Sequence, residues 1–263
     1  MKKHCNLLVI DDEQVIIDSI CKIASLENLS VESALLGSDA FEKISQTDFD
    51  LIICDIMLPE LDGFQILNEL YRRNIESPVI MTTGYSTIEN AVKSLYLGAI
   101  DFIPKPFTID EMIALINRGM RYSKLLEAKR NEASNVLLVP CPARYFRLGY
   151  SCWMNIQLDG SVIIGATDFF IKTVEPIKQV ELINCGETLR QASACAKFIN
   201  CDEHSHPLYS VLSGNIKERN EKVIKLPELI EKDPYFNGWL YRIIPTELEC
   251  ETKLLIPCSS DRA

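Results

Sequence analysis

The 263-residue chain lacks several features that define common protein classes. No apolar run approaches the roughly 18 residues of a transmembrane helix, so we expect no membrane-spanning segment. The chain holds only 3 His and no CxxC pair, which leaves it without the usual zinc-finger spacing. It also has no Walker A loop, no helix-turn-helix pattern and no basic stripe, so we expect no nucleic-acid partner.

The chain also lacks a recognisable signal peptide and has fewer basic than acidic residues. The first apolar run is too short for a signal-peptide core, and we expect a cytoplasmic protein whose thiols stay reduced. Basic residues number 27 against 37 acidic ones, and the net charge of −10 repels phosphate backbones and anionic lipid. Residues 1–123 carry a net charge of −9 and residues 136–263 only −2, so the two halves differ in kind.

The first half alternates short apolar runs, typical of buried parallel strands, with segments of helical periodicity. We expect strands at 7–10, 31–35, 51–54, 79–81 and 101–103. We expect helices at 14–26, 40–44, after Gly63, at 88–97 and from Thr108. This (βα)5 order predicts an α/β fold with a parallel sheet and helices on both of its faces.

The carboxyl ends of parallel strands meet at one edge of a sheet, which is where ligands bind. The residues at those ends are three carboxylates, a hydroxyl and an ammonium group: Asp11, Asp12, Asp55, Thr83 and Lys105. Clustered carboxylates favour a hard divalent cation such as Mg²⁺. A central carboxylate can attack phosphorus and form an acyl phosphate, while Lys and Thr bind the phosphoryl oxygens. The pattern predicts a phosphoryl-transfer site.

The segments that carry this pattern are LLVIDDE, LIICDIMLPELDGF, PVIMTTGYS and GAIDFIPKPF. In this order, residues 5–123 resemble the receiver domain of two-component response regulators. The resemblance implies a flavodoxin-like fold, phosphorylation by a sensor histidine kinase and a requirement for Mg²⁺. It identifies Asp55 as the phospho-acceptor and Lys105 as the phosphate-binding lysine. It also makes Asp11, Asp12 and the backbone carbonyl of Met57 ligands of the metal, together with Asp55.

The same resemblance implies a switch. Thr83 matches the switch hydroxyl, and Phe102 matches the aromatic residue that changes rotamer with it. A cis peptide bond is implied between Lys105 and Pro106. We interpret Thr82 as an ordinary residue at the end of a strand. Because no member of the set is missing, we expect the domain to be phosphorylated.

A helical connector is expected between the halves, since no proline interrupts the chain from Thr108 to Pro140. We predict domains at 1–123 and 136–263, joined by a connector at 124–135. No heptad repeat is sustained there, and two interpretations stay open. The helix is either a stalk that forms a homodimer or a plain linker.

The second half shows short alternating runs with turn signals, which are typical of β structure. We expect strands at 150–158, 161–164, 179–183, 192–199, 209–212 and 239–244, and short helices at 167–173 and 227–232. The stretches DGSVIIGATDFF, QVELINCGETL, LYSVLSGNI and LPELIEKDPYFNGWLYRIIP resemble the H protein of the glycine cleavage system. That resemblance implies a mostly-β barrel-sandwich hybrid of the lipoyl and biotinyl carrier type, with lipoate on a hairpin lysine.

The carrier lysine itself is absent. Alignment on Leu208 and Tyr209 places Glu203 at its position, and a carboxylate cannot form the amide to lipoate. We therefore expect no lipoate, with Lys197 as the nearest substitute. The hairpin instead holds Cys201, His204 and His206, which could bind Zn²⁺ or another transition metal. An exposed polar hairpin is the favoured interpretation.

These features predict a response regulator, phosphorylated on Asp55, that is no enzyme beyond its own phosphoryl transfer and dephosphorylation. Its degenerate H-protein-like output domain would act by contact with an unidentified protein partner. The alternative is a phospho-regulated carrier, metal or redox module of one-carbon or electron-transfer metabolism. A third hypothesis is a phosphorelay in which His204 or His206 accepts phosphate from Asp55.

Overall fold

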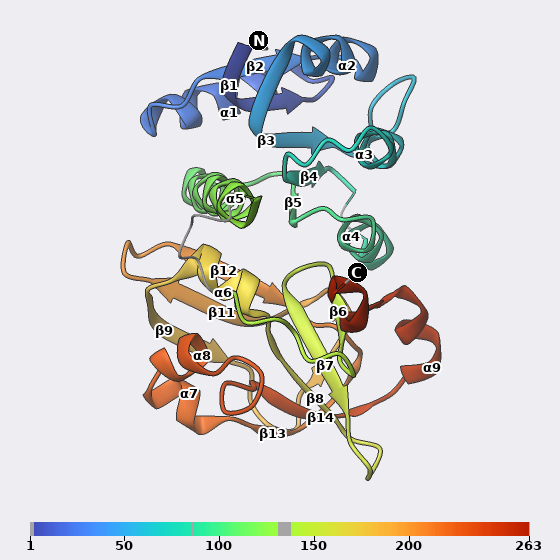
Figure 1. Ribbon diagram of the computed structural model, residues 1–263, viewed down its shortest axis with the longest axis vertical. Coiled ribbons are helices and arrows are strands. Elements are labelled where there is room, and N and C mark those ends of the chain that lie inside the picture. The colour runs from blue at the N-terminus through green and yellow to red at the C-terminus, as the bar shows by residue number, and fades with distance from the viewer. Residues whose placement is uncertain (1–2, 86, 131–137, 263) are drawn as a thin grey trace. The chain divides into compact units, whose positions relative to one another are not determined.

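The computed structural model describes residues 3–85, 87–130 and 138–262 (Figure 1). They form two compact units, the first mainly before residue 137 and the second mainly after it. In the first unit, strands and helices alternate along the chain as the hydrophobic pattern predicts. The strands are β1 (Lys3–Ile10), β2 (Val31–Ala34), β3 (Thr47–Asp55), β4 (Val79–Thr83) and β5 (Asp101–Pro104). The helices are α1 (Gln14–Leu26), α2 (Gly37–Gln46), α3 (Gly63–Arg72), α4 (Ile88–Tyr96) and α5 (Ile109–Arg130).

The sheet of the first unit is parallel throughout, in the order β2-β1-β3-β4-β5. Its central strands are apolar because both faces are covered, and residues 7–10 and 51–54 are buried without exception. In Figure 1, α1 and α5 lie on one side of the sheet, and α2 and α3 on the other. The register pairs Ile10 with Cys54 and Asp55 with Thr82, which brings the strand ends to one edge.

Helix α5 runs for 22 residues and continues past residue 123 to Arg130. Residues 131–135 of the expected connector lie outside the described residues. Arg118, on the buried side of this helix, forms an ion pair with Asp101 of β5 at 2.5 Å. Within the described ranges, no helix is both long enough and apolar enough to cross a bilayer.

The second unit is mostly antiparallel β structure. Its strands are β6 (Phe146–Leu148), β7 (Cys152–Ile156), β8 (Val162–Ala166), β9 (Ile177–Leu182), β10 (Thr188–Leu189), β11 (Ala194–Asn200), β12 (Ser205–Tyr209), β13 (Gly214–Arg219), β14 (Tyr241–Pro245) and β15 (Ile256–Pro257). They form a seven-stranded sheet, β10-β13-β14-β8-β7-β6-β15, and a three-stranded sheet, β12-β11-β9. Its short helices are α6 (Asp168–Val174), α7 (Glu221–Lys225), α8 (Glu228–Lys232) and α9 (Leu248–Glu251).

Trp153 of β7 anchors the core of this unit. The indole is fully buried, and its Nε1 donates a hydrogen bond to the Ala166 carbonyl at 2.8 Å. The rings of Tyr145 and Tyr235 lie with their centroids 5.0 and 6.0 Å from it. Gly165 is required beside the indole, because a Cβ there would lie 2.6 Å from its Cζ2.

One predicted strand of the second unit is wrong. The pattern at 209–212 predicted a strand, whereas β12 ends at Tyr209. The next residues turn, and the Ser210 hydroxyl donates to the Leu212 carbonyl at 2.7 Å. Burial of the Val211 and Leu212 side chains in this turn explains why the run is apolar without being a strand. The pattern also missed β13, where polar residues dominate, and the short strands β6, β10 and β15.

Candidate functional site

Asp55 ends β3 and lies at the centre of a polar cluster at the edge of the parallel sheet. Its carboxylate is almost fully buried, yet both oxygens are bound. Oδ1 lies 2.9 Å from the Lys105 ammonium, and Oδ2 accepts a hydrogen bond from the Met57 amide at 2.6 Å. The negative charge is therefore held in place from two directions.

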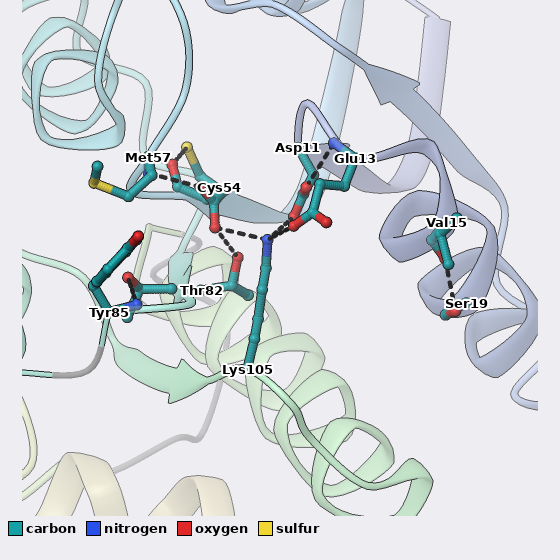
Figure 2. Close-up of polar contacts among 11 residues, drawn as sticks. Asp11, Glu13, Val15, Ser19, Cys54, Met57, Thr82, Tyr85 and Lys105 are labelled. Carbon is teal, nitrogen blue, oxygen red and sulfur yellow. Dashed lines mark hydrogen bonds and ion pairs between the residues drawn. The ribbon is translucent and has the colours of Figure 1, made fainter.

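Lys105, after β5, connects the acids of different segments. Its ammonium lies 2.7 Å from Asp11 Oδ2, and Figure 2 shows the side chain reaching toward Asp11 and Glu13. Burial raises the pKa of Asp11, and the hydrogen bond from Lys105 opposes this rise. Burial lowers the pKa of Lys105, but the hydrogen bonds and charges of Asp11 and Asp55 outweigh it and the pKa is raised. The lysine therefore stays protonated and offsets part of the negative charge of the site.

The loop after Asp55 is shaped by the start of α3. Asp62 and Gln65 form a reciprocal capping box, in which Asp62 Oδ1 accepts from the Gln65 amide at 2.8 Å. The next residue, Gly63, must lack a side chain because the backbone of β3 passes very close to it. A Cβ at Gly63 would lie 2.2 Å from the Asp55 carbonyl oxygen. The glycine thus permits the tight return of the loop that carries Met57.

Both threonines at the end of β4 are fully buried. The Thr83 hydroxyl accepts a hydrogen bond from the Tyr85 amide at 3.0 Å. Thr82, which we interpreted as an ordinary strand residue, has its hydroxyl 3.4 Å from Asp55 Oδ1. The signal that could have found this contact is the parallel register, which pairs Thr82 with Asp55. Phe102 is buried in the neighbouring strand β5.

The acids do not converge as a trio. Asp11 is buried, but Asp12 is exposed to solvent. Over the described ranges of the chain, no group of three or more His, Cys, Asp or Glu side chains is arranged to hold a metal ion. The Lys105 ammonium lies between Asp11 and Asp55 and offsets part of their negative charge. The expected cis peptide bond between Lys105 and Pro106 is present.

The donor set nevertheless fits a hard divalent cation. Two buried carboxylates, Asp11 and Asp55, share one cationic partner, and Asp12 lies beside them in the sequence with its carboxylate in solvent. Carboxylate and carbonyl oxygens are the ligands that Mg²⁺ prefers. A cation that replaced the ammonium between the acids would meet oxygen ligands alone.

The hairpin between β11 and β12 is the second place that the sequence singled out. Glu203 lies at its tip with a positive φ of 63°, and its exposed carboxylate pairs with the Lys178 ammonium. Cys201 is also exposed, whereas His206 belongs to β12 and is only 2% exposed. His204 is half-buried, with its ring 6.5 Å from that of His206. Cys201, His204 and His206 therefore make no metal-binding trio, and the prediction of an entirely exposed polar hairpin is wrong at His206.

Lys197, the nearest substitute for the missing carrier lysine, lies within β11 rather than at the hairpin tip. It pairs in register with Pro207 on one side and Glu181 on the other. Its position is the middle strand of the three-stranded sheet. This position differs from the hairpin tip where a carrier lysine is expected.

Comparison with known families matches both halves of the chain. Residues 7–117 match the response regulator receiver domain, and residues 144–260 match the glycine cleavage H-protein. The first half is therefore a receiver domain and the second an H-protein-like domain, as the motifs predicted.

The chain is also similar to individual proteins. The transcriptional regulatory protein DltR of Streptococcus agalactiae is 36% identical over 132 residues, which are 50% of this chain and 59% of that protein. The receiver domain of NtrX from Brucella abortus is 36% identical, with 44% of this chain and 98% of that chain covered at a TM-score of 0.42. A glycine cleavage system H protein from Mycobacterium marinum is 28% identical, with 40% and 87% covered at a TM-score of 0.38.

Proposed function

We propose that the chain is a cytoplasmic two-component response regulator that a sensor histidine kinase phosphorylates on Asp55. The observation that carries this proposal is the buried network in which Asp55, Lys105 and Asp11 meet. A carboxylate held by an ammonium and a backbone amide is a positioned nucleophile. Its attack on the phosphorus of the phosphorylated kinase histidine would form an acyl phosphate, while the bond from phosphorus to the imidazole nitrogen breaks and the imidazole leaves. The ammonium of Lys105 would then bind a phosphoryl oxygen.

We propose that Asp11, Asp12, Asp55 and the Met57 carbonyl hold Mg²⁺. When bound, the cation supplies positive charge that offsets repulsion between the carboxylates and the incoming phosphoryl group. Thr83 and Phe102 are the proposed switch. The Thr83 hydroxyl would leave the Tyr85 amide for a phosphoryl oxygen, and Phe102 would repack beside it. The change would pass through α5 toward the second domain.

The output is proposed to be contact with a protein partner rather than lipoate transfer or DNA binding. Glu203 at the hairpin tip cannot carry lipoate, because a carboxylate cannot form the amide bond to it. Its carboxylate forms an ion pair with Lys178 instead. The net charge of −2 on residues 136–263 offers no electrostatic attraction to a phosphate backbone. Whether α5 leads into a dimer stalk or a plain linker stays open.

Incubation of the purified chain with a small phosphodonor and Mg²⁺ tests the phosphorylation step. We expect one alkali-labile phosphoryl group on the wild type and none on Asp55→Asn, because an amide cannot attack phosphorus in this way. A metal chelator should abolish labelling as well. Label that persists on Asp55→Asn would contradict the assignment of the acceptor.

A further inference from the structure

Thr82 carries a buried hydroxyl group beside Asp55, and this hydroxyl takes no part in the proposed switch of Thr83 and Phe102. Its residue is fully buried in β4, and its Oγ1 lies 3.4 Å from Asp55 Oδ1. The neighbouring hydroxyl, that of Thr83, accepts from the Tyr85 amide instead. Figure 2 shows Thr82 beside the Lys105 side chain, and the strand register pairs Thr82 directly with Asp55.

The direction of this contact follows from the protonation states. An ionised carboxylate can only accept hydrogen bonds, so the Thr82 hydroxyl donates to Asp55 Oδ1. That oxygen also meets the Lys105 ammonium at 2.9 Å. When Lys105 turns to a phosphoryl oxygen, Thr82 is the donor that the structure leaves beside Oδ1.

We propose that Thr82 shortens the lifetime of the phosphorylated state by stabilising the Asp55 carboxylate as a leaving group. The inference rests on the proposed phosphorylation of Asp55. In hydrolysis, a water oxygen bonds to phosphorus, the water gives its proton to solvent, and the bond between phosphorus and the Asp55 oxygen breaks. The carboxylate leaves with the bonding electron pair and regains its negative charge.

A hydrogen bond to an ionised carboxylate is stronger than one to the uncharged acyl group of an acyl phosphate. The Thr82 donor therefore favours the transition state, in which charge returns to the carboxylate, over the acyl phosphate. The same donor stabilises the free carboxylate before phosphorylation, so it does not accelerate the attack on the phosphodonor. Loss of the hydroxyl should slow dephosphorylation and leave phosphorylation as fast or faster.

The test compares both rates in the full chain. Wild type, Thr82→Val, Thr82→Ala and Thr82→Ser are labelled with acetyl phosphate and Mg²⁺, freed of donor by desalting, and followed by intact mass. The contact at 3.4 Å is long, so we expect a half-life about 3- to 10-fold longer in Thr82→Val and Thr82→Ala. Thr82→Ser keeps the hydroxyl and should retain the wild-type half-life.

Thr47→Val is the matched control, since Thr47 is a buried threonine at the opposite end of β3. It should change neither rate. If Thr82→Val does not fold, the Ala and Ser variants carry the comparison. A half-life that stays the same or shortens on loss of the hydroxyl, or a matching fall in the phosphorylation rate, overturns the inference. An unlabelled wild type contradicts the proposed function itself, and the inference with it.

Discussion

The strand ends of the receiver and the hairpin of the H-protein-like domain make an instructive comparison. The receiver residues were singled out because each follows a predicted parallel strand, and the hairpin residues because they lie close together in the sequence. In the receiver, Asp11, Asp55 and Lys105 come from three distant segments and meet within ionic contact. In the hairpin, Cys201 and His206 are only five positions apart, and one is exposed while the other is buried.

Topology explains the difference. Parallel strands bring their carboxyl ends to a common edge, so residues at those ends converge whatever their separation in the chain. Along a hairpin, by contrast, the local backbone decides where each side chain points. The turn puts Cys201 and Glu203 in solvent, and β12 puts His206 in the interior. Proximity in the sequence was therefore the weaker evidence for a site.

The largest expected effect concerns the buried ion pair of the receiver. Arg118→Met leaves the Asp101 carboxylate without its partner, and burial already raises the pKa of Asp101. We expect the free energy of unfolding of this domain to fall by about 3–5 kcal/mol, followed by urea unfolding of the full chain. Arg72→Met removes an exposed arginine paired with Glu69 and should change little. Equal losses in the two variants would contradict the importance of burial.

The next effect concerns the positive charge of Lys105 at the phosphorylation site. Lys105→Met leaves Asp11 and Asp55 facing each other without the ammonium group. We expect the free energy of unfolding to fall by about 2–3 kcal/mol at neutral pH. Because a divalent cation would restore positive charge between the acids, Mg²⁺ should raise the melting temperature more in Lys105→Met than in the wild type. An equal rise in both proteins would contradict the proposed metal ligands.

A smaller effect uses pH to examine the second domain. Asp168 is buried, its Oδ2 accepts from the Val139 amide at 2.7 Å, and its Oδ1 has no hydrogen-bond partner in the part of the chain that is described. Burial raises the pKa of Asp168, so the folded state favours the protonated form. Stability should fall as pH rises from about 4 through the folded pKa, and Asp168→Asn should remove this part of the slope.

Asp159 provides a control of opposite sign for that measurement. Hydrogen bonds from the Ser161 hydroxyl and amide lower the pKa of Asp159, which favours its charged form in the folded state. Its contribution is present at neutral pH and is lost as pH falls through the folded pKa. Asp159→Asn should therefore flatten the slope on the acid side. If the two variants change the slope in the same direction, the assignment for Asp168 is wrong.

The smallest effect concerns the hairpin itself. Glu203 adopts a left-handed backbone conformation that costs a side chain with a Cβ about 1 kcal/mol, and the exposed pairing with Lys178 compensates little. Glu203→Gly should stabilise the second domain by up to that amount, as measured by thermal unfolding. Glu203→Gln keeps the strain and removes the charge, so it should not stabilise. A gain in Glu203→Gln would attribute the effect to charge instead.

Much of the receiver was predictable because its signals repeat. Every predicted strand and helix of residues 7–130 is present, since the strands carry apolar runs and the helices carry apolar residues at helical spacing. The contact of Thr82 with Asp55 was not predicted, because it depends on the register between β3 and β4. That register is not visible in a single strand.

The second domain was predictable in class but less so in detail. Its strands at 152–156 and 162–166 coincide with runs of apolar residues, whereas β13 has few apolar residues and takes its place through pairing with β14. The apolar run at Val211 and Leu212 is buried in a turn. Long-range pairing decides these elements, and local composition does not reveal it.

The most direct test of the account is intact mass of the full chain, produced in a lipoylation-competent host and then treated with acetyl phosphate and Mg²⁺. We predict an unmodified mass after purification and a single phosphoryl increment after treatment, which Asp55→Asn abolishes. A lipoyl increment on the purified chain, or the absence of any phosphoryl increment on the wild type, would contradict the account.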